Sequence, residues 1–240
     1  VDSDYDYIAS KVQVDHIFNH NKYVIHTHGF SRESVQLEKD SLDRFFKLCR
    51  LTIPNTINLL SFLNDFSEAA FKGLAKYIIL LNRIDYSNIY DSEFNSCFNI
   101  LNEKIVDDNL IINKSSIEKI ENKMELFFYD KSICEKDINS SEEFLNSIGI
   151  NKDNAYRFIS GHVLFDLIKK VHKLNLSQLM RDEIKKINKD VTGSEIQDRV
   201  NQIKSRFNNS FSFDTYCHMR QVDIQDEVHR LILSDIANIK

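Results

Sequence analysis

Apolar residues recur with the period of an α-helix along most of this chain. The longest stripe runs from Leu59 to Leu81 and follows Pro54, a residue that suits the first turn of a helix. A shorter stripe with the same spacing begins after Ser41. Further periodic segments cover residues 163–174, 179–187, 196–207 and 222–236. The pattern predicts that the longest helix begins at Pro54 and runs through this stripe to Leu81, and that the C-terminal half is helical.

Two short motifs indicate additional helix starts. Ser115-x-x-Glu118 and Ser140-x-x-Glu143 each resemble a capping box, in which a hydroxyl and a carboxylate bind the free amides of a first turn. Gly149 is a residue type that commonly follows a last turn. The sequence therefore predicts helices that begin at Ser115 and Ser140, with the second ending before Gly149.

A different pattern occupies residues 22–28, which read Lys-Tyr-Val-Ile-His-Thr-His and stop at Gly29. A short run of β-branched and aromatic residues bounded by glycine is typical of a strand. Val1 is in a position to end another strand. We therefore expect an α/β fold, with a sheet region near the N-terminus followed by a mostly helical region.

Composition supports long helices and indicates a cytoplasmic protein. Only 5 Gly and 1 Pro occur in 240 residues, too few turn formers for a many-stranded sandwich or barrel. The four cysteines lie far apart and lack the spacing of a zinc site or a small disulfide framework. No apolar run approaches the roughly 20 residues that span a membrane. The net charge of −5 argues against general coating by nucleic acid but not against a local basic groove.

Three carboxylates stand at alternate positions at the very start of the chain: Asp2, Asp4 and Asp6. Alternate side chains of an extended segment share one face, so Asp2 and Asp4 are placed to hold one cation. Hard ions such as Mg²⁺ prefer oxygen ligands, and they assist phosphodiester cleavage by stabilising charge and activating water. The alternative is a solvated acidic turn.

Three segments resemble the Toprim-like nucleases that are paired with ABC-type ATPases in bacterial anti-phage defence, including the PARIS-type effector subunits. The first is Val1-Asp2-Ser3-Asp4-Tyr5, similar to the family's strand ending in D-x-D. The second is Ser31-Arg32-Glu33-Ser34, similar to its S-x-E-N turn except that Ser34 replaces Asn. The third, residues 160–167 with Gly161-His162, is similar to a late G-[HK]-x-L-x-x-L segment.

The resemblance implies a Toprim-like metal-binding region at 1–85 and a helical region for substrate, dimer or partner contacts at 86–240. Asp2, Asp4 and Glu33 would bind Mg²⁺ or Mn²⁺ and carry catalysis. The implied function is cleavage of nucleic acid, RNA such as tRNA rather than DNA, by a homodimeric toxin-like effector held by an ABC-type ATPase. We expect the first strands to precede Val1. The family's upstream Glu either precedes Val1 as well, or the chain is catalytically incomplete.

Histidines and lysines supply weaker candidates for substrate binding. His26 and His28 alternate on the expected strand, and His162 follows Gly161 at an expected helix start, where free amides favour an anion. Lys169, Lys170 and Lys173 form a basic run suited to a phosphate backbone. The alternatives are ordinary strand histidines, a capping turn and a solvated helix face.

A second class of function remains open, a non-catalytic helical adaptor that docks to an ATPase partner. Amphipathic helices with aromatic faces serve protein interfaces as well as substrate grooves. Cys217-His218 has no evident partner base, so we expect packing rather than a thiol nucleophile there.

Overall fold

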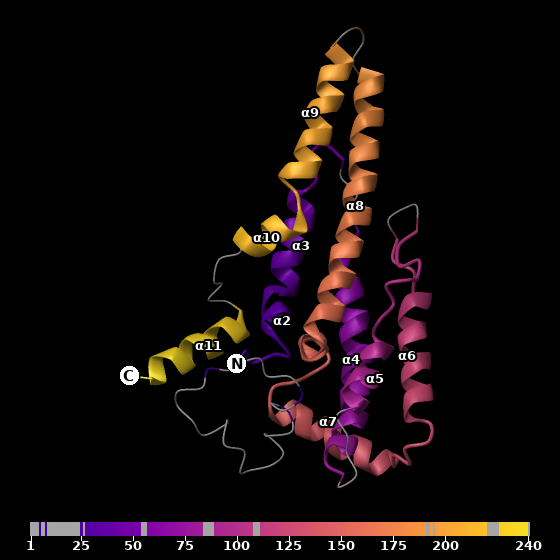
Figure 1. Cartoon of the computed structure of the whole chain (residues 1–240), viewed down its shortest axis with the longest axis vertical. Coiled ribbons are helices and arrows are strands. Elements are labelled where there is room, and N and C mark those ends of the chain that lie inside the picture. The colour runs from indigo at the N-terminus through magenta and orange to yellow at the C-terminus, as the bar shows by residue number, and fades with distance from the viewer. Residues whose placement is uncertain are drawn as a thin grey trace.

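The computed structural model describes residues 5, 8, 25, 27–53, 57–83, 89–107, 111–190, 193, 195–219 and 226–239. Within these residues the fold is all-α (Figure 1). The sole β pairing found there is an isolated antiparallel bridge between Val106 and Ile112. The expectation of an α/β fold with a Toprim-like sheet was therefore wrong for the described part of the chain.

The backbone around His28 shows why the expected strand does not form at its described end. His28 has a φ of 51°, in the left-handed region, where an extended strand cannot continue. The Thr27 hydroxyl donates to the Gly29 carbonyl at 3.1 Å, which closes a local turn. The β-branched residues of this segment favoured a strand, but no neighbouring strand is described that could pair with it.

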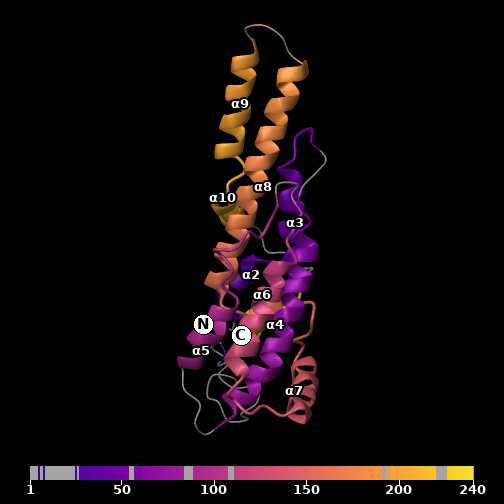
Figure 2. The ribbon, with the colours of Figure 1, turned by 90° about the vertical axis from the view of Figure 1, so that its right-hand side faces the viewer.

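Helix α4, Leu59–Leu81, is the centre of the core (Figure 2). The structure confirms a helix over the predicted apolar stripe, but this helix begins at Leu59 and not at Pro54. It is also not the longest described helix, because the one over Gly161–Asp190 has 30 residues. The Asn58 side chain caps the first turn by accepting from the Ser61 amide at 3.1 Å. Most of the helix is buried, and Gly73 lets α6 approach so closely that a Cβ there would lie 2.5 Å from Met124 Sδ.

The other helices of the body pack around α4. Those in contact with it are α3 (Lys39–Leu48), α6 (Ser115–Phe128), α7 (Glu135–Ser147) and the 3-10 turn η1 (Ala155–Phe158), while α5 (Ile89–Cys97) packs on α6. Helix α2 (Arg32–Gln36) lies against α8 (Gly161–Asp190). The C-terminal elements are α9 (Glu195–Asn209), α10 (Phe213–Met219) and α11 (Glu227–Asn238). One continuous apolar core reaches from Tyr5 to Phe213.

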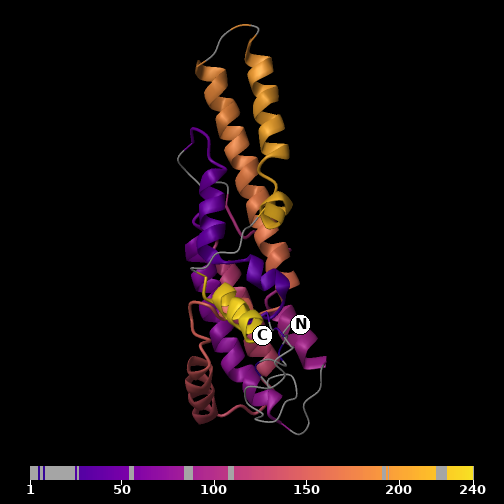
Figure 3. The same cartoon turned by 90° about the vertical axis from the view of Figure 1, so that its left-hand side faces the viewer.

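Helices α8 and α9 form an antiparallel pair that projects beyond the body in all three orthogonal views (Figures 1, 2 and 3). With 30 residues, α8 is about 45 Å long at 1.5 Å per residue. Its first half packs on the body, and its second half packs on α9. We call residues 184–190 and 195–206 the arm.

Helix α6 begins at Ser115 as predicted, but the expected capping box does not form there. The amide of Ser115 instead donates to the side chain of Asn113 at 3.1 Å. Ser140 lies inside α7, which begins at Glu135, and its hydroxyl donates to the Lys136 carbonyl. Gly149, with a φ of 86°, ends that helix as predicted. Among the described residues, no helix is both long and apolar enough to cross a membrane.

Candidate functional site

The structure brings together two of the segments that carry the resemblance. The Ser31 hydroxyl donates to Glu33 Oε2 at 2.7 Å, and the Ser31 amide donates to Ser34 Oγ at 3.4 Å. This turn lies on the first residue of α8, where a Cβ on Gly161 would be 2.0 Å from Ser31 Oγ and 3.1 Å from Glu33 Cβ. Glycine at position 161 is therefore what permits the two segments to touch.

Glu33 and His162 are the titratable pair of this site. Glu33 Oε1 lies 4.0 Å from His162 Nδ1, and the His162 side chain is 81% exposed. Partial burial alone would raise the pKa of Glu33, but the hydrogen bond from Ser31, together with a backbone hydrogen bond and the charges of His162 and Arg32, lowers it. Glu33 is accordingly a carboxylate at neutral pH, facing an exposed imidazole.

The proposed metal ligands are not assembled in the described residues. Asp2 and Asp4 lie outside them, so Glu33 is the sole described member of that set. No group of three His, Cys, Asp or Glu suited to a metal ion occurs in the described part of the chain. Since Mg²⁺ takes several oxygen ligands, the described residues do not by themselves fit the ion. The described residues therefore support no catalytic step that uses Mg²⁺.

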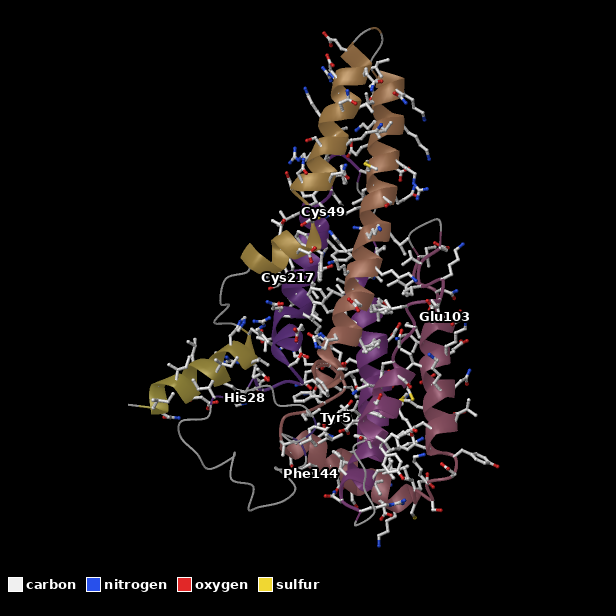
Figure 4. All side chains as sticks on the ribbon, viewed as in Figure 1. Tyr5, His28, Cys49, Glu103, Phe144 and Cys217 are labelled. Carbon is white, nitrogen blue, oxygen red and sulfur yellow. The ribbon has the colours of Figure 1, made fainter. Side chains whose placement is uncertain are left out.

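Of the two histidines in residues 22–28, the structure describes only His28. His26 lies outside the described residues, whereas His28 lies between the body and α11 (Figure 4). His28 Nε2 is 2.7 Å from Asp235 Oδ2 on α11, a contact between positions 207 apart in sequence. His28 therefore holds the C-terminal helix and does not contact Glu33 in the described structure.

The basic run of α8 is largely engaged within the protein. Lys169 binds Asp214 at 2.8 and 3.0 Å, and Lys170 donates to the carbonyls of Leu101 and Glu103. Lys173 is exposed. These three lysines do not form one open groove, so the structure favours the alternative of a helix face for this run.

A buried ion pair was missed from the sequence. Arg157 Nη1 donates to Asp226 Oδ1 at 2.9 Å, and the two side chains are only 9% and 3% exposed. Burial alone would lower the pKa of Arg157, but Tyr156 and Asp226 raise it, so the guanidinium stays charged. Asp226 also caps α11 by accepting from the Val228 amide. The partners are 69 positions apart, and no local motif marks Asp226.

The arm was also missed as a unit, although its helices were predicted. Its base is a small cluster of Cys49, Leu179 and Phe207, and Cys49 is seen where the lower end of α9 meets the body (Figure 4). Above the base, Val200 is the one residue of the described arm that is buried. Six Lys or Arg against three Asp or Glu give the arm a formal charge of +3 and leave −8 for the rest.

No family model, curated protein or solved structure matches this chain. The resemblance to Toprim-like effectors is therefore carried by its three short segments alone. Two of them, at Ser31–Ser34 and Gly161-His162, are in contact. The sheet that such a nuclease uses to position its carboxylates does not occur among the described residues.

Proposed function

We propose that this chain is a non-catalytic helical adaptor that docks through its arm to an ABC-type ATPase subunit. The observation that carries the proposal is the projection of α8 and α9 beyond the core that stabilises the rest of the protein. A helix that is polar over most of its circumference gains little from folding against its own chain. Its exposed length is then available to a partner.

The charge of the arm indicates what kind of surface it would meet. The arm is basic while the remainder of the chain is acidic, so an acidic surface on the ATPase would attract the arm and repel the body. Lys186, Lys189, Arg199 and Lys204 are exposed there, with no carboxylate partner among the described residues. Such complementarity orients a complex and makes its association sensitive to salt.

The test is co-expression with a candidate ABC-type ATPase subunit, followed by size-exclusion chromatography. The parent should co-elute, and the pair Lys189→Glu with Lys204→Glu should elute apart from the ATPase. The matched control reverses two exposed lysines of the body, Lys136 and Lys152, with the same change in net charge. Loss of the complex in the control but not in the arm variant contradicts the proposal.

A second candidate function, a nuclease, is favoured by one specific observation. The Ser31-Glu33 turn and His162 come from distant parts of the chain and meet at the start of α8. A carboxylate near an exposed imidazole is a usual pairing for proton transfer. This candidate is tested by measuring metal-dependent degradation of RNA and DNA by the parent and by the variants Asp4→Asn and Glu33→Gln.

A further inference from the structure

A cavity of about 280 Å³ lies between η1, the start of α3 and the start of α11, and neither Glu33 nor any residue of the arm lines it. Small-ligand pockets usually measure about 300–1,000 Å³, so this one is of a size for a small molecule. Buried polar residues line it: Arg157, Asp226, Glu38 and Tyr156. A buried polar group without a hydrogen-bond partner lowers the stability of a protein, so the partners of these four side chains indicate what the cavity can bind.

The two buried carboxylates of the lining, Glu38 and Asp226, already have donors. Glu38 accepts from the Asp40 and Ser41 amides at 2.7 and 2.6 Å. Asp226 accepts from Arg157 and from the Val228 amide at 3.1 Å. The buried acceptors of the cavity are therefore largely occupied by the protein itself.

The guanidinium of Arg157 is different. It carries five N–H groups, and two of them have protein acceptors: Nε donates to the Tyr156 hydroxyl at 3.2 Å, and Nη1 donates to Asp226. The three others, on Nη1 and Nη2, have no acceptor among the described residues. The guanidinium thus has N–H groups to spare, on a residue that is only 8% exposed.

We propose that this cavity binds a small oxyanion, a carboxylate or a phosphate, through the open N–H groups of Arg157. The planar fork of a guanidinium matches both groups, and such charge-assisted bonds are stronger than neutral ones. The cationic side chain of Lys39 also lines the cavity. Exposed carboxylates, Asp153 and Glu227, occur in the lining as well, and their negative charge would lower the affinity for an anion.

The site would also affect the C-terminal helix. Asp226, the cap of α11, is held by the same guanidinium, and Val228 and Leu231 of α11 line the cavity. A bound oxyanion would therefore add contacts between η1 and α11. Ligand binding is expected to protect the amides of α11 against hydrogen exchange, because a ligand that binds only the closed arrangement stabilises it.

The experiment is isothermal titration of the full chain with succinate, inorganic phosphate and the neutral analogue succinamide, at constant ionic strength. Saturable binding of succinate alone indicates a carboxylate ligand, and saturable binding of phosphate indicates a phosphate or its ester. Arg157→Lys keeps a charge for Asp226 but removes the fork, and should weaken binding about tenfold or more. Lys152→Gln, which removes a cation outside the cavity, should not.

A second variant keeps the test decisive if Arg157→Lys does not fold. Leu231→Trp narrows the cavity and leaves the Arg157–Asp226 pair in place, since Leu231 is 41% exposed. It should also weaken binding. The inference is overturned if no oxyanion saturates the parent, if succinamide binds equally well, or if Leu231→Trp binds as the parent does.

Discussion

Glu183, buried near the base of the arm, binds Thr52 through both of its carboxylate oxygens. Oε1 accepts from the Thr52 amide and from the Ile53 amide at 3.0 Å, and Oε2 accepts from the Thr52 hydroxyl at 2.9 Å. The contact joins α8 to the loop after α3 over 131 positions of sequence. Glu183 is therefore the anchor that fixes α8 to the body, and the projecting part of α8 begins after it.

Replacing the anchor should loosen this junction. Glu183→Ala leaves the two amides and the hydroxyl of a partly exposed loop without their acceptor, and should lower the free energy of unfolding by about 1–2 kcal/mol. Asp182→Ala is the matched control, because Asp182 bonds only its own helix, at Gln178 and Lys185, and should cost within about 0.5 kcal/mol. Urea unfolding measures both. Equal losses would show that Glu183 is no anchor.

A buried histidine should make stability depend on pH. His172 donates from Nε2 to the Phe211 carbonyl at 2.7 Å, and burial among Phe45, Phe46 and Phe213 lowers its pKa to about 4. The unfolded chain binds this proton near pH 6.5 and the folded chain does not. Burial of the neutral His172 therefore costs no stability above pH 6.5, and the free energy of unfolding falls as the pH drops toward 4.

The size of that effect follows from the shift, at about 1.4 kcal/mol per pKa unit. Stability should fall by about 3 kcal/mol between pH 6.5 and 4 on account of His172. Carboxylates titrate in the same range, so the measurement is the difference between the parent and His172→Phe. A difference that does not change with pH would contradict the assignment.

The contact between α2 and α8 can be tested at Gly161. Gly161→Ala places a Cβ 2.0 Å from Ser31 Oγ, and overpacking of this kind costs about 1–3 kcal/mol. Ser31→Ala removes the clashing oxygen, so the double variant should be destabilised by less than the sum of the two single variants. Thermal melts of the parent, the two single variants and the double variant provide the four stabilities of this double-mutant cycle. Strict additivity would mean that the two residues do not touch.

The nuclease candidate makes a prediction about the acidic start of the chain. Asp4→Asn and Glu33→Gln should each abolish metal-dependent cleavage of nucleic acid, because each removes a negative charge that would hold the metal, while Asp6→Asn should retain activity. Glu33 is partly buried and accepts a hydrogen bond from Ser31, so Glu33→Gln should also lower the free energy of unfolding, by about 1 kcal/mol. Cleavage by Asp4→Asn at the rate of the parent, or by the parent without a divalent metal, removes this candidate.

Sequence patterning was informative where one long apolar stripe determined the outcome, as in α4. It misplaced the start of α7 because Ser140-x-x-Glu143 is also compatible with a helix interior, where the Ser140 hydroxyl bonds the previous turn. The strand expected at 22–28 was wrong at its described end because the backbone of His28 is left-handed and no neighbouring strand is described, neither of which the β-branched residues reveal. The Arg157–Asp226 pair and the Glu183 anchor likewise depend on long-range packing that no local motif encodes.

The most direct test of the adaptor proposal is hydrogen exchange measured on the chain alone and in complex with the ATPase. The account predicts that amides of residues 184–190 and 195–206 become protected in the complex, and that the protection weakens as salt is raised. Protection confined to the turn at Ser31–Ser34 and to His162, with no change in the arm, would contradict it.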